Sequence, residues 1–109
     1  MKKKLNQELT QDQIQRLINA GANRWTKYER DRLYIRRLAD LIGLSYTRYN
    51  SGNVSSAELN GESISNSECN RILAALDKAY IDLKTNTVYI DGRDDAAEVI
   101  ISGLEDYLA

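Results

Sequence analysis

Apolar residues recur along the chain with two different spacings, which predict short helices and short strands. Ile14, Leu17 and Ile18 lie on one apolar stripe of a helix that we expect over about 11–20. Thr10 and Gln13 have the spacing of a capping box, in which two side chains satisfy backbone N–H groups at a helix start. The first helix is therefore expected to begin directly after Thr10.

The next segment alternates between polar and apolar residues over 32–36, as a strand with one buried face does. We expect residues 24–28 to be the hairpin partner of this strand, with the turn at 29–31. Residues 37–42 are expected to form a short helix that ends at Gly43, because glycine is favoured just after a helix.

A second hairpin is predicted over 44–49 and 54–59, joined by a two-residue Ser-Gly turn. This register pairs Tyr49 with Val54. The predicted buried face carries Leu44, Tyr46, Ala57 and Leu59, and the predicted solvent face carries Ser45, Thr47, Ser56 and Glu58.

An Asn-Gly pair at 60–61 favours a type I′ turn into a short strand at 62–64. A second capping box at 65–68 begins a helix whose apolar stripe runs from Cys69 to Tyr80. The single cysteine is therefore expected to be a small buried hydrophobic residue rather than a nucleophile.

Two further strands are expected at 81–83 and 88–90, as a small hairpin or a pair of edge strands, and Asp94 or Asp95 opens a last helix. The element order is α-β-β-(α)-β-β-β-α-β-β-α. It predicts one small α+β domain over 1–109, in which antiparallel hairpins form a sheet packed against helices.

Residues 1–8 are expected to be a flexible basic tail, because the lysines that begin it have no apolar stretch behind them. That start does not match a signal peptide. The chain also has no run of eighteen apolar residues, so we expect no membrane span and a cytoplasmic location.

The absence of certain residue types excludes several kinds of chemistry. The sequence has no histidine, which excludes His-based acid–base catalysis and His-containing metal sites. One cysteine excludes an internal disulfide and a Cys-rich zinc site. No phosphate-binding or dinucleotide-binding glycine motif is present. We therefore expect neither catalytic residues nor a cofactor.

Charge is distributed unevenly along the chain. Residues 1–48 hold eleven Lys or Arg and five Asp or Glu, a net charge of +6. Residues 49–109 hold four and eleven, a net charge of −7. The asymmetry indicates either a basic and an acidic patch, or two halves that neutralise each other across the fold.

The segment 24–37 is rich in arginine and aromatic residues. With an even-numbered loop, Trp25 would share a solvent face with Arg32, Tyr34 and Arg36. With a three-residue loop, Trp25 would enter the core. The outward trio is either a contact face or a solvated strand face with arginine stacked on tyrosine. The candidate binding residues are Arg24, Lys27, Arg30, Arg32, Tyr34, Arg36, Arg37 and Arg48.

Asp91, Asp94, Asp95 and Glu98 form an acidic cluster that is the second candidate surface. Such a cluster can imitate phosphates toward a basic partner, or hold Mg²⁺ or Ca²⁺. The spacing does not match a calcium-binding loop, and a turn followed by a helix start also explains it. We expect no metal site here.

Several short motifs between residue 25 and about residue 90 carry a resemblance to known proteins. They are Trp25-x-Lys27, Asp31-Arg32-Leu33-Tyr34-Ile35, Leu41-x-Gly43-Leu44, Tyr49-x-x-Gly52-Asn53 and Asn60-Gly61-Glu62-x-Ile64-Ser65-Asn66-Ser67. The chain is similar in these motifs to short, mostly uncharacterised proteins of bacterial phages and mobile elements. The resemblance implies a cofactor-free protein that works by binding, as anti-CRISPR proteins do.

Three functions follow, in order of preference. The first is a non-enzymatic inhibitor that contacts a host defence protein or nucleoprotein complex. The second is an accessory protein that binds nucleic acid through 24–37. The third is a metal-dependent enzyme that uses the acidic cluster at 91–98. An edge strand would also allow a homodimer.

Overall fold

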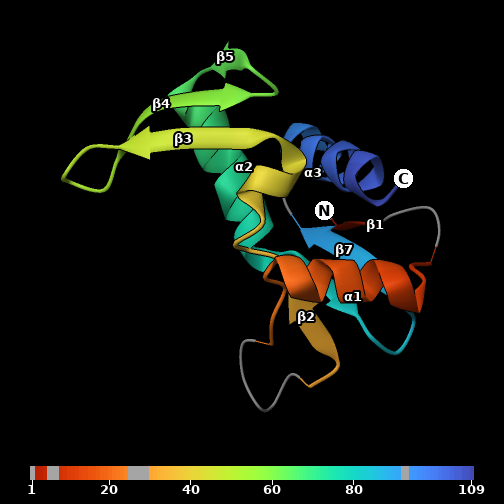
Figure 1. Ribbon diagram of the computed structural model, residues 1–109. Coiled ribbons are helices and arrows are strands. Elements are labelled where there is room, and N and C mark those ends of the chain that lie inside the picture. The colour runs from red at the N-terminus through yellow and green to blue at the C-terminus, as the bar shows by residue number, and fades with distance from the viewer. Residues whose placement is uncertain (1, 5–7, 25–29, 92–93) are drawn as a thin grey trace.

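The computed structural model describes residues 2–4, 8–24, 30–91 and 94–109. Within them, seven strands, three α-helices and one 3-10 helix form an α+β fold, which confirms the predicted class. The strands make two antiparallel sheets, whereas we expected one. Figure 1 shows the sheets toward opposite ends of the molecule.

The larger sheet has the strand order β1-β7-β6-β2. Its strands are β1 (Lys2–Lys4), β2 (Arg32–Tyr34), β6 (Tyr80–Asp82) and β7 (Thr87–Asp91). The β6–β7 hairpin confirms the prediction for this part of the chain. All neighbouring pairs in the sheet are antiparallel.

Two parts of this sheet differ from the sequence-based expectation. Lys2–Lys4 pair with β7, although we placed them in a flexible tail. The ladder partner of β2 is β6, and only Asn23 from the preceding segment bridges to Tyr34. The predicted strand at 24–28 and the loop that sets the face of Trp25 fall largely within 25–29, outside the described residues.

The smaller sheet has the order β3-β4-β5, with β3 (Leu44–Arg48), β4 (Val54–Leu59) and β5 (Glu62–Ile64). Asn60 and Gly61 have φ angles of 53° and 85°, as the predicted type I′ turn requires. The predicted pairing of Leu44 with Leu59 and of Tyr46 with Ala57 is confirmed.

A β-bulge makes the pairing of Tyr49 with Val54 wrong. Thr47 pairs with Ser56 but Arg48 pairs with Val54, so Ser55 is an extra residue. Strict alternation would put Val54 on the solvent face beside Ser56. Because the bulge shifts the alternation by one residue, Val54 is buried, with 4% of its surface exposed.

The helices are α1 (Gln11–Ala20), α2 (Asn66–Lys78), α3 (Asp94–Leu108) and the 3-10 helix η1 (Ala39–Ile42). The first capping box is confirmed, because Gln13 N–H donates to Thr10 Oγ1 at 3.1 Å and Thr10 N–H donates to Gln13 Oε1 at 2.9 Å. Of the apolar stripe predicted for α1, Ile14 and Leu17 are buried, but Ile18 is exposed. No helix of the described residues is long and apolar enough to cross a membrane.

Helix α2 ends at Lys78, two residues before the end of the predicted stripe. Ala79 is extended, with φ −72° and ψ 140°, so Tyr80 enters β6 instead of continuing the helix. The start was predicted correctly, since Glu68 N–H donates to Ser65 Oγ at 3.0 Å.

One hydrophobic core connects the two sheets, because α2 contacts both β4 and β7. Helix α3 lies so close to η1 that a methyl group on Gly103 would come within 2.6 Å of Ile42 Cα. The core face of the larger sheet is made by Leu33, Ile35, Ile81, Val88 and Ile90.

Candidate functional site

A row of three tyrosines crosses the larger sheet on the face opposite to the core residues. Tyr34 pairs with Tyr80, and Tyr80 pairs with Tyr89, so the three side chains are in register on neighbouring strands. The ring centroids of Tyr34 and Tyr80 are 5.8 Å apart, and those of Tyr80 and Tyr89 are 5.7 Å apart. These distances are typical of interacting aromatic rings.

Two arginines cover this row. The guanidinium carbon of Arg32 lies 4.3 Å from the ring centroid of Tyr80, and that of Arg36 lies 5.0 Å from Tyr34. A guanidinium at this distance is attracted to the negative ring face. We call Arg32, Tyr34, Arg36, Tyr80 and Tyr89 the arginine–tyrosine surface.

The stripe expected from Arg32, Tyr34 and Arg36 is only partly correct. The strand predicted over 32–36 ends at Tyr34, so Arg36 follows β2. Arg32 and Arg36 are half-buried, but Tyr34 has only 6% of its surface exposed. The Tyr80 ring and the Arg36 guanidinium both lie against Tyr34. The alternation of polar and apolar residues correctly predicted that these side chains share one face. It did not predict that Tyr34 is covered, because Tyr80 comes from a strand far away in the sequence.

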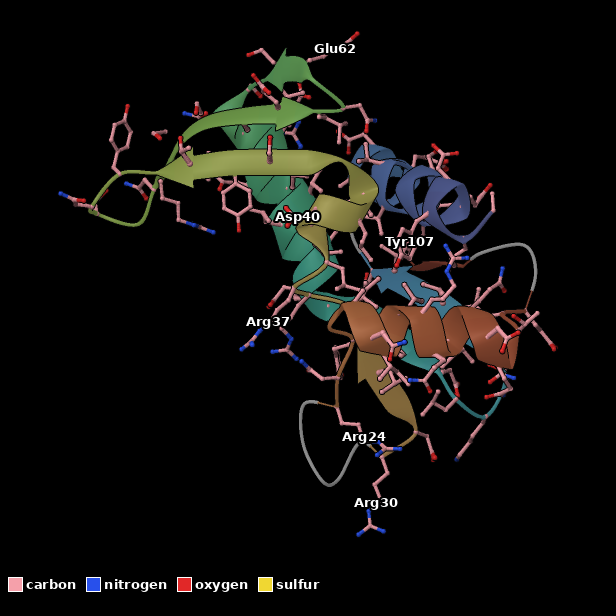
Figure 2. The ribbon with its side chains drawn as sticks, in the orientation of Figure 1. Arg24, Arg30, Arg37, Asp40, Glu62 and Tyr107 are labelled. Atoms are coloured by element: carbon pink, nitrogen blue, oxygen red, sulfur yellow. The ribbon has the colours of Figure 1, made fainter. Side chains whose placement is uncertain are left out.

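Further arginines surround β2. Arg24, Arg30 and Arg37 are exposed, and Figure 2 shows them around this strand, away from Glu62 of the smaller sheet. Arg24 Nε donates a hydrogen bond to the Arg30 carbonyl oxygen at 2.9 Å. The candidates in 24–37 thus lie together, except for Lys27, which is outside the described residues.

Arg48 belongs to a different region, because it ends β3 in the smaller sheet. Its guanidinium carbon lies 5.0 Å from the ring centroid of Tyr46. Tyr46 was expected in the core but has 36% of its surface exposed, since every residue of β3 after Leu44 is exposed.

The predicted acidic residues lie along one turn and helix rather than around one point. Asp91 ends β7, and the exposed Asp95 lies 3.6 Å from Arg71 of α2. An ion pair this exposed contributes little to stability. Among the residues that the structure describes, no three Asp, Glu, Cys or His side chains are placed to hold a metal ion. The side chain of Asp94 is outside that part.

A groove between α3, η1 and the β4–β5 turn was not predicted. It has a volume of about 270 Å³ and is lined by Leu41, Ile42, Leu59, Asn60, Glu98, Val99, Ser102, Gly103 and Asp106. We call it the α3 groove. Glu98, Ser102 and Asp106 recur every four residues, so they lie on one side of α3. That spacing is the one sequence signal that could have indicated the groove.

Cys69 is fully buried in the core, which confirms that it behaves as a small hydrophobic residue. Burial raises the pKa of its thiol, and the positive charge of Arg48 opposes part of that rise. A protonated buried thiol is a poor nucleophile.

Comparison of the chain with protein-family models, curated proteins and solved structures found no match.

Proposed function

We propose that this chain is a non-enzymatic binding protein of the bacterial cytoplasm that inhibits a host defence complex, and that the arginine–tyrosine surface contacts the target protein. The observation that carries this proposal is the stacking of Arg32 and Arg36 on tyrosine rings of the sheet.

A stacked guanidinium has lost part of its side-chain freedom before a partner arrives. Ordering a long side chain at an interface costs about 0.5–1.5 kcal/mol, so an arginine that is already held binds a carboxylate at lower cost. Arginine and tyrosine are also enriched among the residues that dominate binding energy. The exposed Arg24, Arg30 and Arg37 would speed association with an acidic target.

The cover of the tyrosine row favours a protein over a nucleic acid as the partner. Bases stack on open aromatic faces when single strands bind. Here arginines lie over Tyr34 and Tyr80, and Tyr34 is buried. Nucleic-acid binding is the second candidate because Arg24, Arg30 and Arg37 can still contact phosphates around β2.

Phage plating on a defended host tests the inhibitor function. Expression of the chain is expected to raise phage plating efficiency on cells that carry an active defence system, and to leave plating on undefended cells unchanged. The double variant Arg32→Ala/Arg37→Ala is expected to lose the effect. A protein that leaves plating unchanged across defence systems of several types would contradict the proposal.

Arg16→Ala is a matched control for these variants. Arg16 also lies over a tyrosine, with its guanidinium carbon 4.9 Å from the Tyr107 ring, but on α1. Its loss should leave the inhibition intact.

A gel shift with single-stranded and duplex DNA separates the second candidate, because phosphate contacts weaken steeply as salt rises. A shift that Arg32→Ala/Arg37→Ala abolishes would favour the nucleic-acid function.

A further inference from the structure

The end of the β3–β4 hairpin projects from the molecule and carries exposed aromatic rings. We call residues 46–54 the hairpin tip. Among the described residues, three large hydrophobic side chains are exposed, and two of them lie here: Tyr46 at 36% and Tyr49 at 63%, against 39% for Ile18 of α1. Figure 1 shows the tip extending beyond the helices.

Hydrogen bonds close the tip into one shape. Tyr49 N–H donates to the Asn53 carbonyl oxygen at 2.8 Å, and Gly52 N–H donates to the Tyr49 carbonyl oxygen at 2.9 Å. Arg48 Nη1 donates to the Gly52 carbonyl oxygen at 2.7 Å. A loop that is ordered before it meets a partner loses less entropy on binding.

Side-chain hydrogen bonds also hold the base of the tip. Thr47 Oγ1 lies 2.6 Å from Ser55 Oγ and 2.7 Å from Ser56 Oγ, so the bulge brings three hydroxyl groups together. Val54 anchors the same point in the core. The exposed Tyr49 ring therefore stands on a fixed support.

The composition of the tip is that of a contact loop. It combines tyrosine with Ser, Asn and Gly, as antibody binding loops do. Arg48 is the only charged residue between Asp40 and Glu58, so the tip carries one positive charge and no acid. Its complement is a recess with apolar walls and carboxylates at the rim.

The α3 groove has those properties and lies at the other end of the same sheet. Leu41, Leu59 and Val99 line it, and the exposed Glu98 and Asp106 contribute carboxylates. It adjoins the start of β3, where Asn60 N–H donates to the Gly43 carbonyl oxygen at 2.8 Å. In Figure 1 the tip and the η1–α3 region lie at opposite ends of β3.

We infer that the hairpin tip of one copy docks in the α3 groove of a second copy. Tyr49 enters the groove over Leu41 and Val99, and Arg48 contacts the Asp106 carboxylate. Because tip and groove are different surfaces, the contact is head-to-tail, and each bound pair leaves one tip and one groove for further copies. This inference goes beyond the proposed function and does not depend on it.

The proposed contact is small, so it is expected to be weak. A buried tyrosine contributes about 150–250 Å², while a stable interface buries roughly 800 Å² on each partner. We therefore expect association in the high micromolar range, strengthened at low salt by the Arg48–Asp106 pair.

Sedimentation of the purified chain over rising concentration tests this inference. The mean mass of the wild type is expected to rise with concentration. Tyr49→Ala and Asp106→Ala should each weaken association about tenfold or more. Ile18→Ala is the matched control, because among the described residues Ile18 is the exposed large hydrophobic side chain outside the hairpin tip, and its loss should change nothing. A wild type that stays monomeric at about 1 mM, where a contact of high micromolar affinity would be largely formed, would overturn the inference.

Mixing two defective copies tests the head-to-tail geometry. Tyr49→Ala/Arg48→Ala lacks the tip and Asp106→Lys lacks the groove, so neither should associate alone. Their mixture keeps one intact tip and one intact groove, and is expected to form a pair that grows no further. Association of either variant alone, or no pairing in the mixture, contradicts the docking. Arg32→Ala/Arg37→Ala should associate like the wild type, which separates this result from the proposed inhibition.

Discussion

The arginine–tyrosine surface and the hairpin tip contain the same residue types, but Tyr34 is buried in the first and Tyr49 is exposed in the second. In both, an arginine lies about 5 Å from a tyrosine ring. On the larger sheet, Tyr34 is almost fully covered, with 6% of its surface exposed. In the tip, Tyr46, which lies beside Arg48, is 36% exposed and Tyr49 is 63% exposed. The difference comes from the neighbouring strands rather than from the residues themselves.

Strand β2 pairs with β6, so Tyr80 lies against Tyr34 on the outer face and the buried Ile81 lies opposite Leu33 on the core face. Strand β3 is an edge strand of the smaller sheet, and every residue after Leu44 is exposed, so these residues meet water. The comparison indicates that one region mainly stabilises the fold and holds its arginines still. The other contributes little to stability and leaves its rings available for contact.

The largest expected effect is the difference in the free energy of unfolding between alanine substitutions of Tyr34 and of Tyr49. Tyr34→Ala removes a buried ring and should lower the free energy of unfolding by about 3–5 kcal/mol. Tyr49→Ala should change it by less than about 0.5 kcal/mol, because its ring is mostly in water. Urea unfolding followed by circular dichroism measures both. Equal losses would mean that the tip packs on the core in solution.

Glycine substitutions sharpen the comparison at a smaller scale. Gly103→Ala places a methyl group against Ile42, where α3 packs on η1, and should cost about 1–3 kcal/mol, although alanine usually favours a helix. Gly52→Ala in the tip meets no neighbouring atom, and costs about 1–2 kcal/mol only through its φ of +94°. Ser102→Ala, one residue away on α3, is the neutral control in the same unfolding assay.

The smallest effect concerns the buried Cys69 thiol, whose pKa the charge of Arg48 influences. Burial raises the pKa of Cys69, so the folded state favours the protonated thiol. Stability from this group is complete below the unfolded pKa of about 8.5 and is lost as the pH rises through the folded value. Cys69→Ala should therefore make the free energy of unfolding fall less steeply as the pH rises through the alkaline range.

Arg48→Ala removes the positive charge that opposes the rise, so it should raise the pKa of Cys69 further and slow reaction with a thiol reagent at about pH 8.5. Faster reaction would show that loosening of the tip outweighs the charge. Tyr49→Ala controls for loosening, because it changes the tip without changing its charge.

Local signals predicted local structure well. Thr10 and Gln13 located the start of α1, and the Asn60-Gly61 pair located its turn, because each rests on bonds within a few residues. The candidate arginines of 24–37 were found for the same reason, since those described are neighbours of one short strand. The α3 groove was not found, because its walls come from three distant parts of the chain.

The sequence by itself therefore determined the α+β class, most element boundaries and the side of β2 that carries Arg32 and Arg36. Only the tertiary structure decided which strands pair, that Tyr34 is covered, and that Val54 reaches the core through a bulge. The physical reason is distance along the chain. Capping and turn formation involve adjacent residues, whereas burial depends on side chains that folding brings from tens of residues away.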